Sequence, residues 1–324
     1  MKALQVTARG QAEFVDTPKP EMRPGHALVR PSLVSLCGSD IWLLDHAPDD
    51  RYPCPAGTTG HEVIAEVIEV DQSAPGLDSA ITVGSQVLAL APDHCGMSEF
   101  YLAPVENLLP LPNRKTAEEY LMAQQLGTVI YAARYLPNVI GKTVAVIGQG
   151  SAGLWFNVML KRFGARRVIA LDHHSHRREL GLRYGADAVL NGNDSEAEAQ
   201  LLDENNGQHA DIVIEAAGRE SAINLSYRLA RDFDGFILQF GLPRDPLTVD
   251  YSTMFWKRLT VKSMVHAARE PQHSSTRHAL ELIDTQLDVT PLLTHRFQFE
   301  EVQQAFDRQR TASDGAVKTL IEIP

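Results

Sequence analysis

The chain has 324 residues, of which 44% are hydrophobic and 22% charged, and its formal net charge is −11. This length exceeds what one hydrophobic core usually supports, so we expect a globular protein of two domains. An acidic chain repels nucleic acid and anionic lipid, and its apolar runs are shorter than the roughly 20 residues that span a bilayer. We therefore expect neither a nucleic-acid nor a membrane partner.

The cysteine content and the first residues bear on the cellular compartment. Three cysteines, an odd number, do not make a disulfide framework in a chain of this length. The segment MKALQVTARG lacks the apolar core of a secretory signal. Both observations predict a reduced, cytoplasmic environment.

The N-terminal part, to about residue 110, is predicted to be rich in β-structure. Apolar and polar residues alternate there in segments that Pro and Gly residues separate, namely 26–36, 61–70, 85–92 and 98–104. Such alternation is typical of strands that bury one face.

The pattern changes from about residue 140. Short apolar runs predict buried strands at 142–148, 167–172, 210–218 and 234–241. A helix-like segment, residues 154–164, separates the first two. Strands that alternate with helices predict a parallel, doubly wound sheet.

The last part of the chain returns to mixed structure. We expect a helix near 275–287, the segment 295–306 as part of this mixed α and β region, and a final strand within 316–323. The simplest arrangement is an α/β protein with one domain inserted into another. A nucleotide-binding domain, residues 123–266, would interrupt a β-rich domain formed by residues 1–122 and 267–324.

A glycine-rich turn lies between the strand at 142–148 and the helix that follows. VAVIGQGSAG places Gly148, Gly150 and Gly153 in the G-x-G-x-x-G spacing of dinucleotide-binding proteins. Gly148 permits the tight turn, Gly150 lets the backbone approach a pyrophosphate, and Gly153 lets helix and strand pack closely. The helix start at Ser151 offers N–H groups to the phosphates.

Asp172 ends the second apolar strand, 24 residues after the first glycine of the motif. A carboxylate there can accept hydrogen bonds from both ribose hydroxyls of an adenosine and repels a 2′-phosphate, which favours NAD over NADP. NADP stays open, because a phosphate could be contacted by the basic residues that follow, His173, His174, His176 and Arg177.

A candidate metal site is split between two motifs. Cys37 lies in the segment LCGSDIW. The segment GHE supplies His61, 24 residues after Cys37, and Glu62. Cys, His and Glu are ligands of first-row metals, and Cys with His is typical of zinc. The spacing does not establish a site, since a lone Cys is often a small buried apolar residue.

Taken together, C-x-S-D, G-H-E and G-x-G-x-x-G resemble the zinc-dependent medium-chain dehydrogenase/reductase family of alcohol, polyol and sugar dehydrogenases. The resemblance runs nearly end to end and includes residues 98–112 and the C-terminal return from residue 295. It implies a GroES-like β-rich catalytic domain and a Rossmann domain with a doubly wound parallel sheet.

The resemblance implies roles for the residues around the metal. Cys37 and His61 match two catalytic zinc ligands, and Glu62 matches a carboxylate near the metal. Asp40 matches the carboxylate that holds the zinc-bound imidazole, an arrangement that fixes the imidazole tautomer. Ser39 matches the hydroxyl that binds the substrate alcohol and begins the proton relay.

The third zinc ligand and the cofactor contacts are also implied by the resemblance. Gln124 stands where the family usually has Cys or Glu. Some sugar dehydrogenases of the family have Gln at this position, so either Gln124 or Glu62 would complete the site. Thr128 and Ala152 match residues behind the nicotinamide ring. Lys318 matches a basic residue that reaches the pyrophosphate.

Three departures from the family concern the zinc content, the proton relay and the substrate. The four-cysteine lobe is missing and only Cys95 remains there, so we expect one catalytic and no structural zinc. Trp42 replaces a relay histidine, so water or His46 would continue the proton path. Ala91 replaces a bulky aromatic residue, which favours a ring-shaped or extended secondary alcohol.

These features predict an NAD- and zinc-dependent oxidoreductase that interconverts a secondary alcohol, such as a polyol or sugar, and its ketone by hydride transfer. A zinc-free reductase on the same fold and a non-catalytic nucleotide-binding sensor are the alternatives. The resemblance also implies a homodimer or homotetramer. The apolar segments 234–240 and 258–265 could supply edge strands for it, or could be buried core strands.

Overall fold

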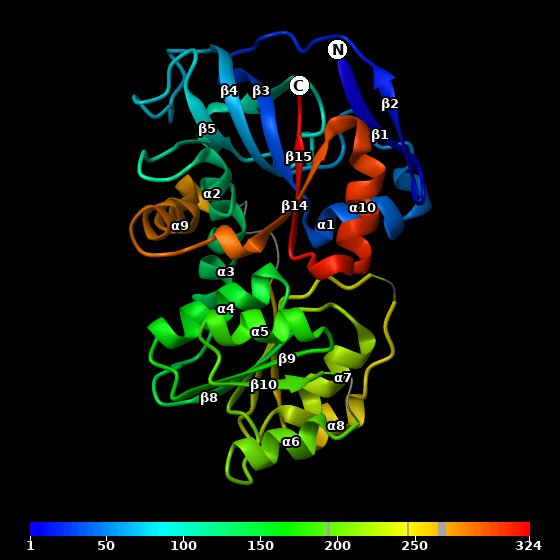
Figure 1. Ribbon diagram of the computed structural model, residues 1–324, viewed down its shortest axis with the longest axis vertical. Coiled ribbons are helices and arrows are strands. Elements are labelled where there is room, and N and C mark those ends of the chain that lie inside the picture. The colour runs from blue at the N-terminus through cyan, green and yellow to red at the C-terminus, as the bar shows by residue number, and fades with distance from the viewer. Residues whose placement is uncertain (193–194, 245, 265–269) are drawn as a thin grey trace. The chain divides into compact units, whose positions relative to one another are not determined.

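The structure, a computed structural model, describes residues 1–192, 195–244, 246–264 and 270–324. The chain divides into two compact units, which are Met1–Thr128 with Ala268–Pro324, and Val129–Ala267. Each unit is built around its own β-sheet (Figure 1), and the predicted α/β class is confirmed. The predicted boundary between 266 and 267 falls outside the described residues, and the one between 122 and 123 stays a prediction.

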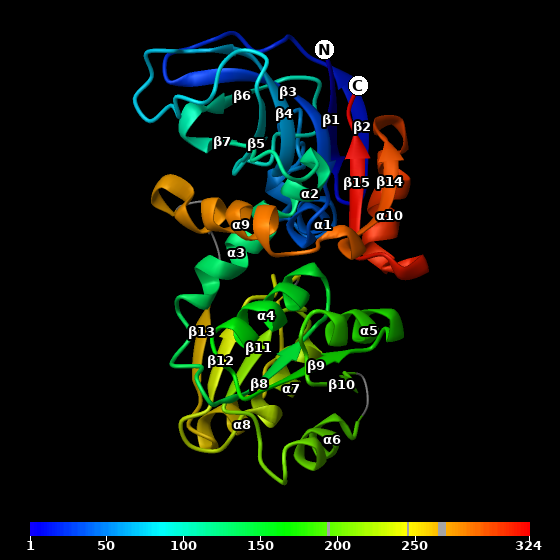
Figure 2. The same ribbon diagram turned by 60° about the vertical axis from the view of Figure 1, so that its left-hand side comes forward.

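The first unit contains a mixed sheet of seven strands. Their order is β14-β15-β3-β4-β5-β7, and β6 pairs with β3 (Figure 2). The last strand lies antiparallel beside β3, so the C-terminal return completes a sheet that the N-terminal part begins. The strands are β3 (His26–Ser35), β4 (Glu62–Val70), β5 (Gln86–Ala89), β6 (Tyr101–Pro104), β7 (Leu108–Pro110), β14 (Leu293–Gln298) and β15 (Lys318–Glu322).

A hairpin and several helices complete the first unit. Strands β1 (Lys2–Ala8) and β2 (Gln11–Asp16) form the antiparallel hairpin. Most of the helices connect or cover the strands just described. They are α1 (Gly38–Asp45), α2 (Ala117–Leu121), α9 (Ser274–Thr285) and α10 (Val302–Thr311), and the short 3-10 helices Asp49–Arg51, Val105–Asn107, Pro271–His273, Thr290–Leu292, Phe299–Glu301 and Ser313–Gly315.

The core of the first unit joins residues from both ends of the chain. Val34 of β3, Val63 of β4 and Ile321 of β15 are fully buried in one cluster with Phe306 of α10. The four strands predicted between residues 26 and 104 are confirmed as β3 to β6, and the predicted last strand as β15. Alternation identified them because each strand places every second side chain in this core.

The second unit is a six-stranded parallel sheet with helices on both faces. The strand order β10-β9-β8-β11-β12-β13 is the 3-2-1-4-5-6 order of a Rossmann sheet. Helices α4 and α5 lie on one face, and α6, α7 and α8 on the other (Figures 1 and 2). The strands are β8 (Thr143–Ile147), β9 (Arg167–Asp172), β10 (Ala188–Asn191), β11 (Ile212–Glu215), β12 (Phe236–Gln239) and β13 (Thr260–Ser263).

The helices of this unit follow its strands in alternation, as predicted. They are α4 (Ser151–Arg162), α5 (Ser175–Arg183), α6 (Ala197–Glu204), α7 (Glu220–Leu229) and α8 (Tyr251–Trp256), and α3 (Ala123–Ala133) crosses the division between the units. Within the described ranges, no helix has the length and apolar composition needed to cross a membrane.

The strands of the second unit differ in burial. All five residues of β8 are buried, as expected for a strand that helices cover on both faces. Segment 234–240 forms the internal strand β12, whereas 258–264 contributes the edge strand β13; residue 265 lies outside the described residues. Only β13 therefore offers a free edge among the two candidate segments.

The glycine-rich turn shows why two of its glycines are needed. Gly148 has φ +91°, a left-handed conformation that other residues rarely adopt. A Cβ atom added to Gly153 would lie 1.8 Å from the carbonyl oxygen of Gly148. Helix α4 can therefore pack this closely against β8 only without a side chain at position 153.

We predict that Gly153→Ala destabilises the protein, because the new methyl group must push the turn and the helix apart. The expected loss is about 1–3 kcal/mol in the free energy of unfolding, measured by urea denaturation. Gly150→Ala is the matched control, since the nearest atom to its added Cβ is Arg177 Nη1 at 4.0 Å. It should cost less than about 1 kcal/mol, the scale of a changed helix cap. Equal losses would contradict this account.

Candidate metal site and nucleotide-binding loop

Strand pairing brings the two halves of the candidate metal site together. Ser35 at the end of β3 pairs with Glu62 at the start of β4, so the segments that continue from these residues meet. Cys37 precedes α1, and His61 precedes β4. One ligand atom from each of Cys37, His61 and Glu62 lies within 4.8 Å of the others. The predicted cluster therefore exists in space.

The Glu62 carboxylate is buried and only half satisfied. Its Oε2 accepts hydrogen bonds from Ser35 Oγ and from Lys318 Nζ. Its Oε1 has no partner in the described structure and lies 4.0 Å from His61 Nε2. A buried oxygen without a donor is costly, and a cation held by this oxygen, a thiolate and an imidazole would satisfy it. The residues present fit a zinc ion.

The structure gives Lys318 a partner that the sequence did not predict, and its predicted contact with a pyrophosphate stays a prediction. Its side chain is fully buried at the first position of β15, and Nζ donates to Glu62 and to the carbonyl oxygen of Leu36 at 3.2 Å. An ammonium group buried in such a pair compensates the charge of Glu62. The sequence did not reveal this pair, because it depends on β15 lying beside β3.

Asp40 lies beside His61, as the resemblance implied. Its Oδ2 accepts from Cys37 N at 2.8 Å, and its Oδ1 accepts from Gly60 N at 2.9 Å. His61 Nδ1 is 3.6 Å from Oδ1, which is longer than a hydrogen bond. Burial alone would raise the pKa of Asp40, but the imidazoles of His61 and His94 hold this pKa well below its usual range. Asp40 is therefore ionised.

The ionised carboxylate and the thiol act back on His61. Burial alone would lower the pKa of His61, but Asp40 and then Cys37 raise this pKa well above its ordinary value. His61 thus holds a proton that a metal ion would have to displace. Binding of a metal here must be coupled to proton release.

Sequence reasoning missed His94. Its Nδ1 donates to Asp40 Oδ1 at 3.1 Å, and its ring centroid lies 4.4 Å from that of His61. Asp40, His61 and His94 thus form a second group with metal-ligand atoms within 4.8 Å of one another. No spacing rule links His94 to CGSD or GHE, so only the folded loop reveals it.

The remaining cysteines show no sign of metal binding. Burial first, and then Asp93, raise the pKa of Cys95 to about 12, so its thiol stays protonated. Burial also raises the pKa of Cys54. Neither belongs to a group of metal-binding residues within the part of the chain that the structure describes.

The residues proposed for the proton path lie at the two ends of α1. Ser39 Oγ is buried and has no hydrogen-bond partner among the described residues. His46 follows the other end of the helix, seven residues later, which is about 10 Å at the usual rise per residue. A proton could pass between them only through intermediate groups such as water.

Gln124 and Thr128 lie on α3. The Thr128 hydroxyl donates to the Gln124 carbonyl oxygen at 3.1 Å, one turn earlier, and both residues are half-buried. Their predicted roles, as third ligand and as a residue behind the nicotinamide, stay predictions.

The glycine-rich loop and Asp172 adjoin one another in the second unit. Gln149 N donates to Asp172 Oδ2 at 2.7 Å, and His174 N donates to Oδ1 at 2.8 Å. Helix α4 begins at Ser151 and Ala152 with no side-chain cap from Gly150. Its first N–H groups therefore remain available to an anion, and space is open around Gly150. These residues fit a dinucleotide.

The histidine rings that follow Asp172 lie close to one another. The ring centroids of His173 and His174 are 3.9 Å apart, and those of His174 and His176 are 5.3 Å apart. Burial and neighbouring positive groups lower the pKa of both His174 and His176, so they are mainly neutral near pH 7. Neutral rings attract a phosphate less than charged ones, whereas the Arg177 guanidinium near Gly150 stays charged, so the choice of NAD over NADP stays a prediction.

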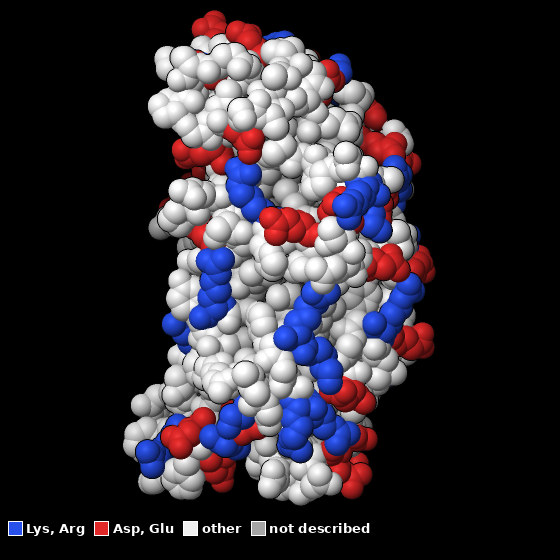
Figure 3. All heavy atoms as spheres, turned by 90° about the vertical axis from the view of Figure 1, so that its left-hand side faces the viewer, with Lys and Arg blue, Asp and Glu red and all other residues white. Residues whose placement is uncertain are grey.

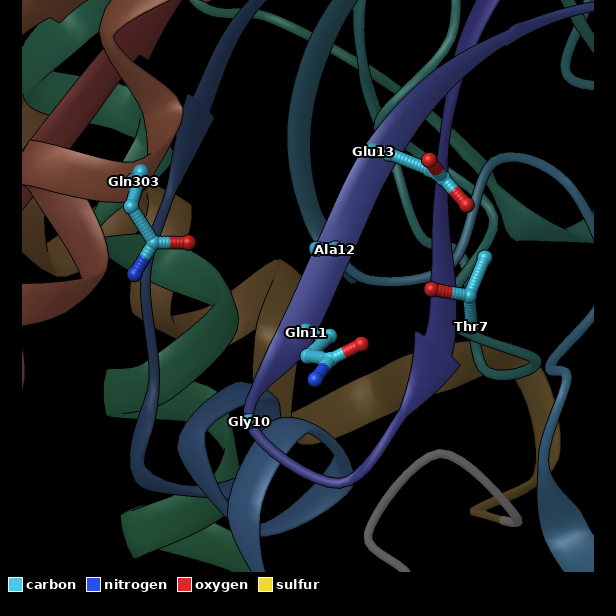
Figure 4. A pocket seen from close by; sticks show the side chains of 6 residues that line it. All are labelled: Thr7, Gly10, Gln11, Ala12, Glu13 and Gln303. Atoms are coloured by element: carbon cyan, nitrogen blue, oxygen red, sulfur yellow. The ribbon is translucent and has the colours of Figure 1, made fainter.

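A surface cavity of about 350 Å³ lies elsewhere, on the β1–β2 hairpin (Figure 4). It contains no residue of the clusters above. Its walls are polar or small side chains, namely Thr7, Gly10, Gln11, Ala12, Glu13 and Gln303.

Two family descriptions match most of the chain. "Alcohol dehydrogenase GroES-like domain" matches residues 23–113, and "Zinc-binding dehydrogenase" matches residues 152–285. With the two sheets and the clustered ligands, these matches show that the chain belongs to the zinc-dependent medium-chain dehydrogenase family. The predicted combination of a GroES-like and a Rossmann domain is confirmed.

Relatives cover nearly the whole chain. An alcohol dehydrogenase of Cupriavidus necator is 26% identical over 370 residues, which cover 99% of this chain and 98% of that protein. An L-threonine 3-dehydrogenase of Shewanella halifaxensis is 25% identical over 332 residues, 94% of each. A structure described as a short chain alcohol dehydrogenase (rspB) from E. coli CFT073, complexed with NADH, has a TM-score of 0.82 at 21% identity and 99% coverage of both chains. The relatives support an oxidoreductase.

We predict that Lys318→Met destabilises the protein by about 3–5 kcal/mol, because it leaves the Glu62 carboxylate buried without a cation. Urea denaturation would measure this loss. Adding Glu62→Gln should recover at least half of it, since the uncompensated charge is then removed. If Lys318→Met instead kept wild-type stability and weakened NAD binding, the result would contradict this account and support a contact between Lys318 and the pyrophosphate.

Proposed function

We propose that this protein is an NAD- and zinc-dependent oxidoreductase that interconverts a secondary alcohol, such as a polyol or sugar, and its ketone. The observation that carries the proposal is the cluster of Cys37, His61 and the buried Glu62, in which Oε1 of Glu62 lacks a partner among the described residues. The dehydrogenase relatives support the reaction class.

The chain's own residues would do the following. Cys37 and His61 would hold the zinc ion, and Gln124 or Glu62 would complete its ligands. Asp40 orients His61. When bound, zinc supplies a Lewis acid and NAD accepts a hydride.

Ser39 would orient the substrate and begin the proton path. Its hydroxyl is buried and has no partner in the described part of the chain, so it can accept the proton of an alcohol while donating its own onward. Water, or water with His46, would carry the proton further, since Trp42 cannot. Ala91, which the resemblance matches to a position that often holds a bulky aromatic residue, would leave room for a ring-shaped or extended substrate.

NAD would bind through the loop that Gly148, Gly150 and Gly153 shape. The N–H groups of Ser151 and Ala152 at the start of α4 would receive the pyrophosphate. Asp172 would receive the adenosine ribose: backbone N–H groups already hold both of its oxygens, and each retains a lone pair for a ribose hydroxyl. Thr128 and Ala152 would support the nicotinamide.

We also propose a single catalytic zinc per chain, a small-molecule alcohol or ketone as substrate, and a cytoplasmic homodimer or homotetramer. Basic side chains are interspersed with acidic ones on the face in Figure 3, which supports the expectation of no nucleic-acid partner. A surface for self-association would combine the edge strand β13 with the exposed side chains of Tyr251, Phe255 and Trp256 on α8.

One observation favours a zinc-free reductase as the second candidate. Lys318 already neutralises Glu62, so the cluster does not require a metal ion to balance that carboxylate. A zinc-free enzyme would keep the same nucleotide loop, and metal content separates the two candidates.

We predict that the purified protein contains about one zinc per chain and forms NADH when supplied with NAD and a panel of polyols, sugars and secondary alcohols. Cys37→Ser should lose most of the zinc and at least about 100-fold in kcat/KM, because a thiolate ligand is removed. Cys54→Ser, outside the cluster, is the matched control and should retain both. Zinc below about 0.2 per chain, with turnover insensitive to chelator, would exclude the zinc mechanism.

We predict that Asp172→Gly relaxes discrimination against NADP by about tenfold or more, because it removes the carboxylate that would repel a 2′-phosphate. The ratio of kcat/KM for NAD to that for NADP measures this change. Asp234→Gly, an exposed aspartate of the same unit with φ +65°, is the control and should leave the ratio unchanged. An unchanged ratio in Asp172→Gly would show that this residue is not the selector.

A further inference from the structure

We propose that His94 is a positioning residue that competes with His61 for Asp40, and that zinc binding exchanges one imidazole for the other on Asp40 Oδ1. The proposal rests on the zinc site proposed above. It concerns how readily this chain takes up the metal, and it assigns a role to a residue that the sequence motifs do not identify.

The argument begins with the acceptor capacity of Asp40. Each carboxylate oxygen has two lone pairs. Both positions on Oδ1 are used, by Gly60 N at 2.9 Å and by His94 Nδ1 at 3.1 Å. His61 Nδ1, 3.6 Å from the same oxygen, has no hydrogen-bond partner among the described residues. Without metal, His94 therefore occupies the position that His61 needs.

A metal ion changes which imidazole should hold that position. A histidine that binds zinc through one nitrogen almost always donates its other N–H to a carboxylate or carbonyl, which fixes the ring. His61 faces the cluster with Nε2, 4.0 Å from Glu62 Oε1, and Asp40 with Nδ1. Zinc at Nε2 therefore requires a hydrogen bond from Nδ1 to Oδ1, which His94 must yield.

The exchange needs little movement. His61 Nδ1 must approach Oδ1 by about 0.7 Å to reach an ordinary hydrogen-bond length. The rings of His61 and His94 already pack against each other, with centroids 4.4 Å apart. The His94 side chain is 22% exposed, so water can satisfy its nitrogen after it leaves.

The backbone keeps His94 next to this site in either state. His94 N donates to the carbonyl oxygen of Ala91 at 2.8 Å, which closes a turn. Gly96 N donates to the carbonyl oxygen of Gly60 at 3.0 Å, which fastens the turn to the loop that carries His61. The exchange is thus a movement of side chains within a fixed pair of loops, and its cost lowers the affinity for zinc.

The experiment compares zinc affinity in the wild-type protein and in His94→Phe. Phenylalanine keeps a ring to pack on His61 and removes the competing donor. We expect zinc to bind about tenfold more tightly, the scale of one hydrogen bond to a charged group, in a competition titration with a chromophoric chelator. His26→Phe is the control: its ring bonds the Pro24 carbonyl at the start of β3, and its affinity should match wild type. Equal or weaker affinity in His94→Phe would overturn the proposal.

A second measurement uses the unaltered protein, so it does not depend on how the variant folds. Long-range ¹H–¹⁵N spectra of the histidine rings should show a protonated, hydrogen-bonded Nδ1 on His94 before zinc is added. Zinc should abolish that signal and produce one from His61 Nδ1–H. An unchanged His94 ring in zinc-loaded protein would overturn the exchange while leaving the zinc function intact. Failure of the protein to bind zinc at all would overturn both.

Discussion

The buried carboxylate of Glu62 in the first unit needs a cation to compensate its charge. Lys318, 256 residues further along the chain, supplies that cation. This pair requires β15 to lie beside β3, so it depends on the return of the C-terminal segment to the sheet. The pairing of β3 with β4 places Cys37 and His61 next to Glu62. The ion pair therefore links the closure of the domain to the formation of the metal cluster.

The cluster is built from groups that hold one another in place. Asp40 is surrounded by N–H donors of Cys37, Gly60 and His94, and Glu62 by Ser35 and Lys318. Each carboxylate is thus oriented from behind and presents an oxygen toward His61. Such support fixes both carboxylates, so the exchange proposed on metal binding is confined to the imidazoles of His61 and His94.

The metal cluster and the nucleotide-binding loop differ in how far the sequence alone could predict them. The nucleotide loop is local: Gly148, Gly150 and Gly153 lie within six residues, and Asp172 follows on the adjacent strand. The conformation required at Gly148 and the contact that excludes a Cβ at Gly153 both lie inside one strand–turn–helix unit. Local geometry of this kind leaves a spacing pattern that can be identified without the fold.

The sequence by itself determined the α/β class, the succession of strands and helices along the chain, the glycine-rich loop and the residue types of the metal cluster. These features follow from periodicity and short motifs. Only the tertiary structure decided that Lys318 neutralises Glu62 and that His94 donates a hydrogen bond to Asp40. Both depend on contacts between distant segments, and burial there changes what a charged side chain can do. Periodicity reports which face of an element is buried, and it carries no information on which distant residue that face will meet.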